Sequence, residues 1–420
     1  MKTSTLRAVD RLVGVPACAM LTLHRRIAGR APSGSVERIL FVKLAEQGST
    51  VLAEAAMREA IARVGRERVY FLVFAENRFI LDVMGLVPAG NVVTIDSSSI
   101  PAVVSSTLSA LRRLRALGID AAIDMEFFAR SSAILAYMSG AARRVGLHAY
   151  EGAGPWRGDL MTHRVNYNPY IHAADFFRLL VAALDQPAGR FPAYGDTPPA
   201  AGGGPADPRP PARADVEAIR GLLREWTGGD RVPPIVLLNA NSSDLVPLRR
   251  WDEARYLELA RRLLEARPGL HVAFTGRPDE AEGAERLARQ VGSPRCASFA
   301  GRTTLGQLLA LYALSQVLVT NDSGPAHFAT LTPIDVVTLF GPETPALFGA
   351  RTPRNHVLWA GLACSPCVNA FNNRLSACRD NLCMQRIAVD DVLAATLAAF
   401  DARGTADRTP DPDAAQREIQ

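Results

Sequence analysis

Residues 317–329 read VLVTNDSGPAHFA, in which a short apolar run is followed by a polar turn and then by a segment that begins near Pro325. The apolar run has the length and composition of a buried strand, and a proline at this place is typical of the first turn of a helix. Backbone N–H groups at a helix start lack partners within the helix and carry a partial positive charge. The stretch therefore predicts a strand, a turn and a helix, with a diphosphate site at Gly324. The alternative is a capped turn of a Rossmann-like sheet without a ligand.

The same alternation extends along the chain in both directions. Apolar runs predict strands at residues 39–44, 69–74, 92–95, 121–125, 235–238, 271–275, 317–320 and 336–340. Helical periodicity between them predicts helices at residues 51–64, 100–117, 251–266, 280–291 and 304–313. Regular alternation of this kind indicates α/β domains with parallel sheets that are covered on both faces.

A Pro/Gly/Ala tract divides the chain. Residues 192–214 read PAYGDTPPAAGGGPADPRPPARA, a composition that does not build a packed core. We predict an N-terminal basic and amphipathic segment (1–35), a Rossmann-like domain (36–191), the linker (192–214), a second Rossmann-like domain (215–402) and a disordered tail (403–420). Two doubly wound domains leave a cleft between the carboxyl ends of their sheets, where open α/β sheets bind ligands.

Composition narrows the partners. The 420 residues carry a formal net charge of +5, which favours anionic partners, but aromatic residues are sparse at 7% and are not interleaved with basic ones. Nucleic acid is therefore not expected. No apolar run reaches the ~18 residues of a membrane-spanning helix. Residues 12–23 are uncharged, mostly apolar and flanked by basic residues, which fits a helix on a membrane surface, an ordinary packing helix, or a signal peptide that Asp10 and Pro16 would interrupt.

Several ordered blocks accompany the NDSGPAH turn of residues 321–327. They read RILFVK at 38–43, NANS at 239–242, RRW at 249–251, TGRPDE at 275–280, FAGRTTL at 299–305 and VVTLFGPETP at 336–345. Over most of residues 36–400 these blocks resemble the ADP-heptose lipopolysaccharide heptosyltransferases, glycosyltransferase family nine. The resemblance implies the GT-B architecture, with two Rossmann-like domains and an interdomain cleft. It also implies metal-independent transfer of heptose from ADP-heptose to a lipopolysaccharide core or another surface glycan, in the cytoplasm or at the inner face of the membrane.

The resemblance also implies the donor site. The turn contributes donor contacts, Arg249 steadies the diphosphate and Glu280 holds the ribose hydroxyls, although the last two also fit ordinary charges at a helix start. The donor-binding residues expected in full are Asn241, Arg249, Glu280, Asn321, Asp322, Ser323, Gly324 and His327.

The catalytic base departs from the family pattern. Relatives carry Gly-Asp after the first strand, whereas Ser49 stands in the place of that Asp, and a serine hydroxyl is no base near neutral pH. Loss of a general base lowers a rate by about 10²–10⁴. Glu46 is the first substitute and could instead be a solvated loop acid. Glu126 is the second and could instead position the acceptor. Lys43, Ser49 and Arg130 are the expected acceptor-binding residues.

Four cysteines crowd into residues 364–383, namely Cys364, Cys367, Cys378 and Cys383. Their spacing fits a structural zinc or an iron–sulfur cluster, or reduced thiols that only stabilise the loop. We expect no required cofactor. Rival functions are a sugar-nucleotide epimerase on the same fold, a homologue that binds sugar nucleotides without catalysis, and a metal-dependent redox or regulatory protein.

Overall fold

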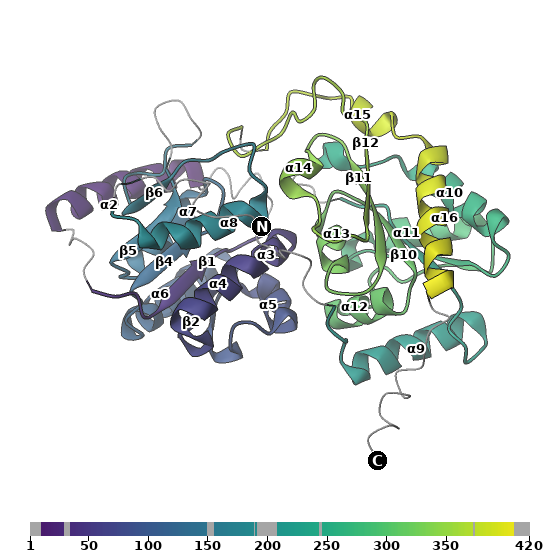
Figure 1. Cartoon of the computed structure of the whole chain (residues 1–420), viewed down its shortest axis with the longest axis horizontal. Coiled ribbons are helices and arrows are strands. Elements are labelled where there is room, and N and C mark those ends of the chain that lie inside the picture. Colours follow the sequence, from purple (N-terminus) through teal and green to yellow (C-terminus); the bar gives the residue numbers. More distant parts are fainter. Residues whose placement is uncertain are drawn as a thin grey trace, which may run out of the picture.

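The computed structural model describes residues 10–28, 34–148, 155–188, 190, 208–242, 246–372 and 374–406. Two lobes lie side by side, each built around a six-stranded sheet (Figure 1). The first lobe comprises the described residues up to 190, and the second lobe comprises those from 208 onward. No helix in the described ranges combines the length and the apolar character needed to cross a bilayer.

The sheet of the first lobe consists of short, almost fully buried strands in the order β3-β2-β1-β4-β5-β6. All neighbouring pairs are parallel. The strands are β1 (Ile39–Val42), β2 (Val69–Phe74), β3 (Val92–Ile95), β4 (Ala121–Asp124), β5 (Arg143–Leu147) and β6 (His163–Val165).

Helices cover both faces of this sheet. One face packs against α3 (Gln47–Leu52), α4 (Glu54–Val64), α5 (Arg78–Met84) and α8 (Ala173–Ala182). The other face packs against α6 (Ile100–Ala116) and α7 (Arg130–Met138), and α2 (Gly14–Ala28) lies on α7. Because each strand is covered on both sides, the strands read as continuous apolar runs rather than as an alternating pattern.

The second lobe repeats the plan with the order β12-β11-β10-β7-β8-β9, again with parallel neighbours. Its strands are β7 (Ile235–Asn239), β8 (His271–Phe274), β9 (Cys296–Ser298), β10 (Val317–Asn321), β11 (Asp335–Phe340) and β12 (Asn355–Trp359). Its helices are α9 (Arg213–Thr227), α10 (Glu253–Ala266), α11 (Ala281–Val291), α12 (Leu305–Ala313), α13 (Gly324–Ala329), α14 (Pro345–Phe348), α15 (Leu382–Gln385) and α16 (Val389–Ala406).

Counted from the first strand of each sheet, both orders read 3-2-1-4-5-6, which is the doubly wound arrangement. The order reverses between β1 and β4 in the first lobe and between β7 and β10 in the second. Loops that leave the carboxyl ends of these strands diverge, so each lobe has a crevice where open sheets of this kind bind ligands. The predicted fold class is confirmed.

The eight predicted strands are present, with ends that differ by at most two residues. The single helix predicted over 51–64 is instead two helices, α3 and α4, separated at Ala53. Most of the predicted linker (192–214) lies outside the described residues, and α9 begins within it at Arg213. α16 continues to Ala406, into the segment predicted as a tail, while residues 407–420 lie outside the described ranges.

The lobes touch through several elements. The side chain of His172 in the first lobe lies 3.0 Å, Nε2 to O, from the carbonyl of Gly349 in the second, and Arg351 pairs with Asp175. α3 packs against α13. A long loop after β12 reaches from the second lobe to the first (Figure 1), where Phe371 packs against Tyr167 with ring centroids 4.9 Å apart.

Candidate active site at the junction of the lobes

The first lobe contributes the loop that follows β1. Lys43 is fully buried, and its Nζ lies 3.4 Å from Oε2 of Glu126 and 3.8 Å from Oε2 of Glu46. Burial lowers the pKa of Lys43, and the charge of Glu126 opposes that shift. The backbone N–H groups of Leu44 and Ala45 donate to Oε1 of Glu126 over 2.7 and 3.0 Å. Glu126 therefore fixes the shape of the loop from the neighbouring strand β4.

Glu46 ends this loop and precedes α3 with a left-handed backbone (φ 65°), which is uncommon for a residue with a side chain. Its carboxylate pairs with Arg374, which lies on the long loop of the second lobe. The hydroxyl of Ser49 lies 3.3 Å from Oε2 of Glu46 and donates to its carbonyl over 2.9 Å. The structure thus places both candidate bases near Lys43, with Glu46 nearer to the second lobe.

The second lobe contributes the turn after β10. Asn321 is fully buried. Its Oδ1 accepts from the backbone N–H of Trp251 and from the hydroxyl of Tyr256, and its Nδ2 donates to the carbonyl of Asn241 over 3.1 Å. Asn321 therefore ties the loop after β7 to the start of α10. The side-chain atoms of Asn321 thus bond to other residues of the protein and hold the walls of the site, whereas the sequence analysis expected them to contact the donor.

Beside Asn321 lies a buried cluster of three charged side chains. Nη2 of Arg249 lies 2.7 Å from Oε1 of Glu343, and its Nε lies 3.2 Å from Oδ2 of Asp322 without hydrogen-bond alignment. The side chains of Asp322 and Glu343 are 4% and 1% exposed. Arg249 is thus a buried counter-charge rather than a solvated residue at a helix start.

Two acids share one guanidinium, so the cluster is short of positive charge. Burial raises the pKa of Asp322, and burial also raises the pKa of Glu343 to about 7 against the opposing effect of Arg249. Burial alone would lower the pKa of Arg249, but the two carboxylates outweigh it and raise the pKa. Arg374 is the next cation, with its Nε 4.0 Å from Oε1 of Glu343. Charged groups therefore run from Asp322 through Glu343 and Arg374 to Glu46 in the first lobe.

The start of α13 faces the first lobe. A Cβ atom on Gly48 of α3 would lie 2.7 Å from the ring of His327 and 3.1 Å from Cα of Gly324. Ser323 occupies the N-cap position, but its hydroxyl bonds to the carbonyl of Asn321 and makes no cap contact. The hydroxyl therefore does not cap α13. Pro325 has no N–H group and the N–H of Ala326 donates to the carbonyl of Ser323 over 3.1 Å, so the N–H of Gly324 is the one at the start of α13 that faces outward without a side-chain cap.

His327 lies on the first turn of α13 and is buried. Burial, with a smaller effect of His172, lowers its pKa to about 3, so the ring is neutral. Its Nδ1 has no hydrogen-bond partner among the described residues. The neutral ring can accept or donate a hydrogen bond to a ligand, depending on its tautomer.

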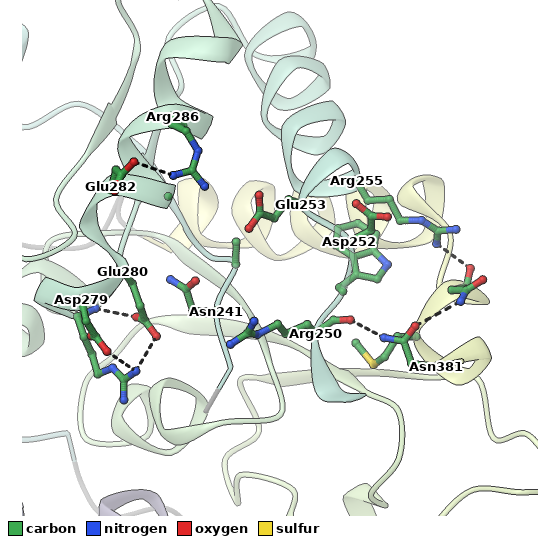
Figure 2. Close-up of a pocket in the computed structure, with 16 residues that line it drawn as sticks. Asn241, Arg250, Asp252, Glu253, Arg255, Asp279, Glu280, Glu282, Arg286 and Asn381 are labelled. Carbon is green, nitrogen blue, oxygen red and sulfur yellow. Dashed lines mark hydrogen bonds and ion pairs between the residues drawn. The ribbon is translucent and has the colours of Figure 1, made fainter. Parts of the chain in front are cut away.

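A cavity of about 730 Å³ opens on the other side of the β10 turn, a size that holds a small ligand. In Figure 2, Asn241 lies between Glu280 and Arg250 on its wall. A Cβ atom on Gly276 would lie 2.9 Å from Nδ2 of Asn241 and 3.1 Å from Oε2 of Glu280, so the glycine lets these two side chains converge. Further charged side chains line the cavity, namely Asp252, Glu253, Arg255, Arg277, Asp279, Glu282 and Arg286.

Glu280 takes part in the local structure of this wall. Its Oε2 accepts from the backbone N–H of Arg277 over 2.8 Å, and its Oε1 lies 3.3 Å from the guanidinium of the same residue. Its side chain is 16% exposed. The carboxylate of Glu280 thus closes the turn after β8 and lines the cavity with Asn241. Asn241 also accepts the hydrogen bond from Asn321, which connects the cavity wall to the β10 turn.

Arg130, expected at the acceptor, has other contacts. Its Nη1 lies 2.8 Å from Oδ2 of Asp10, and its Nε donates to the carbonyl of Trp156. These contacts hold the N-terminal helical region against α7, and the structure gives no support for a contact with an acceptor.

Two charged residues of the site, Glu343 and Arg374, had no role in the sequence prediction. Glu343 lies in the FGPETP block at 340–345, so its place after the Gly-Pro turn of β11 was visible as a signal. Arg374 lies in an irregular loop among the cysteines, 328 positions from Glu46, and no local pattern marks it.

The cysteine loop contains no disulfide among the described residues. Cys364 and Cys378 are exposed, whereas Cys383 is buried, and burial raises its pKa. The hydroxyl of Ser376 lies 3.3 Å from Sγ of Cys367. Within the ranges that the structure describes, no three Cys, His, Asp or Glu side chains are placed to hold one metal ion.

Comparison with solved structures identifies the architecture. The E. coli ADP-heptose lipopolysaccharide heptosyltransferase II superposes with a TM-score of 0.66 at 18% identity, covering 87% of this chain and 99% of that one. The E. coli heptosyltransferase WaaC with ADP gives a TM-score of 0.58 at 18% identity, covering 86% and 99% of the two chains. The two-lobed fold is therefore the GT-B fold of these enzymes.

Sequence comparison is more local. Lipopolysaccharide heptosyltransferase 2 of Salmonella typhimurium is 33% identical over 102 residues, which are 24% of this chain and 29% of that protein. Lipopolysaccharide heptosyltransferase 1 of Pseudomonas aeruginosa is 29% identical over 120 residues, 29% of this chain and 33% of that protein. These matches thus span about a third or less of the relatives' length.

The family model of glycosyltransferase family 9 (heptosyltransferase) matches residues 107–375, well over half of the chain, and includes the β10 turn, Arg249, Glu343 and Arg374. The chain belongs to glycosyltransferase family 9, the heptosyltransferase family.

Proposed function

We propose that this protein transfers heptose from ADP-heptose to the core of a lipopolysaccharide or to another lipid-linked surface glycan, in the cytoplasm at the inner face of the membrane. One observation carries the proposal. The segments that follow β1 and β10 meet where Gly48 of α3 lies against Gly324 and His327 of α13. The cavity of about 730 Å³ lies within the second lobe, and its wall residue Asn241 contacts Asn321 of the β10 turn. A donor held by one lobe and an acceptor held by the other would react at this junction.

The donor side follows from the cavity and the turn. The adenosine occupies the cavity, with its ribose hydroxyls at Glu280 and Asn241. The diphosphate extends past Asn321 to the start of α13, which has no side-chain cap. Arg249, which contacts Asp322 and Glu343, lies near the diphosphate. The solved relative WaaC contains ADP, in support of an ADP-linked donor.

The reaction is a direct displacement. The acceptor hydroxyl attacks the anomeric carbon, its proton passes to the carboxylate of Glu46, and the bond from that carbon to the β-phosphate oxygen breaks, releasing ADP. Arg249 and the N–H group of Gly324 stabilise the charge that develops on the diphosphate. Glu126 is a positioning residue, since it holds the loop that carries Lys43 and Glu46. Protein groups supply every one of these roles, so the proposed mechanism is independent of a metal.

The test is product analysis by mass spectrometry after incubation of the full chain with a panel of nucleotide sugars and lipid-linked glycans. We expect heptose transfer from ADP-heptose. The Glu46→Gln variant should lose about 10²–10⁴ in rate, whereas Glu67→Gln, an acid whose side chain is 78% exposed in the same lobe, should not. Full activity of Glu46→Gln would remove Glu46 as the base.

A second candidate is donor binding without catalysis. It is favoured by Ser49 in the place of the family's Asp, and by the engagement of both candidate bases, Glu46 with Arg374 and Glu126 with backbone N–H groups. Calorimetry separates the two functions. Binding of ADP-heptose without transfer to any acceptor in the panel would support this second function and contradict the first.

A further inference from the structure

α2 has the reverse of the polarity that a surface helix normally shows. The face toward the protein carries small or polar side chains, Gly14, Cys18 and Thr22. A Cβ atom on Gly158 would lie 2.6 Å from Oγ1 of Thr22, so the two segments are in close contact. A surface helix normally buries its apolar face and exposes its polar one. Cys18 and the partly buried Leu21 do join the apolar core of the first lobe, so α2 keeps its place by these two side chains, by close packing and by polar contacts.

Polar contacts fix this orientation at both ends. Asp10, just before α2, pairs with Arg130 at the start of α7 over 2.8 Å. Arg25, in the last turn, pairs with Asp159 over 2.6 Å. The backbone N–H of Asp159 also donates to the hydroxyl of Thr22. α2 is thus held with one defined face toward the solvent.

The outward face of α2 is apolar. Pro16, Ala19, Leu23 and Ile27 follow one another at intervals of three or four residues, all exposed, and Met20 lies beside them. Leu23, Ile27 and Met20 are 59%, 78% and 65% exposed. Leu12 and Val13, at 75% and 62%, continue the exposed apolar surface at the N-terminal end. A contiguous patch of this kind marks a surface that is covered in function.

Basic residues border this patch. Arg11 and Arg26 are exposed, and neither takes part in an ion pair within the described ranges. Residues 1–30 contain six Lys and Arg against one Asp, so this segment carries +5, which is the net charge of the whole chain. The other 390 residues contain 41 basic and 41 acidic residues and are balanced. The excess positive charge of the protein therefore belongs to the segment that contains α2.

We propose that the outward face of α2 docks in the plane of an anionic lipid bilayer, with Leu23, Ile27 and Met20 among the acyl chains and Arg11 and Arg26 at the headgroups. Charge complementarity selects this occupant. Two copies of the chain meeting through α2 would bring two +5 segments together, whereas anionic headgroups neutralise them. An apolar face with arginines along its border is the pattern of helices that lie at a membrane surface.

The placement of α2 also bears on the acceptor, and this part of the inference rests on the proposed function. Asp10 joins the beginning of the helical region to Arg130, the first residue of α7, and α7 follows the strand β4 that leads to Glu126. The carboxyl edge of the first sheet therefore lies next to the N-terminal end of α2. A lipid-linked acceptor would enter the first lobe from the bilayer on which α2 rests.

Flotation of the full chain with vesicles tests the docking without donor or acceptor, so its failure is separate from failure of the proposed transfer. We expect the protein to float with phosphatidylcholine vesicles that contain phosphatidylglycerol, and far less with phosphatidylcholine alone. The Leu23→Glu/Ile27→Glu variant should lose about tenfold or more in partitioning. Arg11→Gln/Arg26→Gln should lose about fivefold for each arginine.

The matched control is Leu375→Glu/Leu382→Glu, which changes the net charge equally at leucines of the second lobe that are 56% and 49% exposed. This control should float like the unmodified protein, and circular dichroism should show that every variant is folded. Equal flotation of the α2 variant and the control would overturn the proposal. So would an α2 variant that still binds vesicles but changes from dimer to monomer in light scattering, since the face would then belong to a second copy.

Discussion

The charge cluster around Arg249 gives the sharpest prediction for stability. In Arg249→Met, a side chain of similar length without charge leaves Asp322 and Glu343 buried without their counter-charge. Removal of one partner from a buried ion pair costs about 3–5 kcal/mol. We expect a loss of about 4 kcal/mol in the free energy of unfolding at pH 8, or about a thousandfold in the equilibrium constant.

The loss should depend on pH in a defined direction. Burial raises the pKa of both carboxyls in the folded state, so the folded protein binds their protons more tightly than the unfolded chain does. A raised acid pKa adds stability at low pH and removes it as the pH rises through the folded pKa, which for Glu343 is about 7. The cost of Arg249→Met should therefore shrink between pH 8 and pH 5, where the stranded acids become neutral.

Urea unfolding followed by tryptophan fluorescence measures this, because Trp226, Trp251 and Trp359 lie in the second lobe. The adjacent Arg250→Met is the control, since Arg250 is exposed and should cost less than about 1 kcal/mol. If the two variants unfold alike, or if the cost of Arg249→Met is the same at both pH values, the interpretation of Arg249 as a buried counter-charge is wrong.

Four further predictions follow from other contacts. Glu126→Ala leaves two backbone N–H groups and a buried lysine without their acceptor, so it should lower the free energy of unfolding, measured by thermal unfolding, by about 3 kcal/mol. Glu126→Gln keeps an acceptor and should lower it less. Equal losses in the two variants would contradict the positioning role. Burial, with a smaller effect of Arg351, lowers the pKa of His172 to about 4. The free energy of unfolding should therefore fall by about 2–3 kcal/mol as the pH drops from 6.5 toward 4. It should fall less in His172→Gln, and an identical pH dependence of the two proteins would contradict this role of His172. Gly158→Ala adds a Cβ against Thr22 at a φ of +72°, so proteolysis within α2 should become faster, and an unchanged cleavage rate would refute the tight packing. Metal analysis of the purified chain should find no stoichiometric zinc or iron, and dialysis against a chelator should leave transfer unchanged, whereas one metal ion per chain would assign the four clustered cysteines to a metal site.

Most of the fold was predictable from the sequence because a strand covered on both faces must be apolar throughout. β1 and β2 read as uninterrupted runs of such residues. The strands that escaped prediction are short or lie toward the sheet edges. β6 and β9 have three residues each, β5 begins with two arginines, and β12 is only partly buried. Local composition does not distinguish these segments from loops.

The site was predictable only where a motif carries it. The β10 turn and Glu280 stand in recognisable blocks, and the structure places them at adjoining walls. Glu46 pairs with Arg374 across the two lobes, and Glu343 pairs with Arg249 within the second lobe. Both pairs join residues far apart in the chain, so only the folded chain brings them together. The contact between Asp10 and Arg130 is equally long-range, so the sequence did not predict it.

Gly48 sets how closely the two lobes approach each other. A methyl group at this position would stand within 2.7 Å of the His327 ring and 3.1 Å of the Gly324 backbone, so the present spacing depends on a single hydrogen atom. Any larger residue there would act as a wedge between α3 and α13. Such a protein would keep both sheets intact while holding the two lobes farther apart.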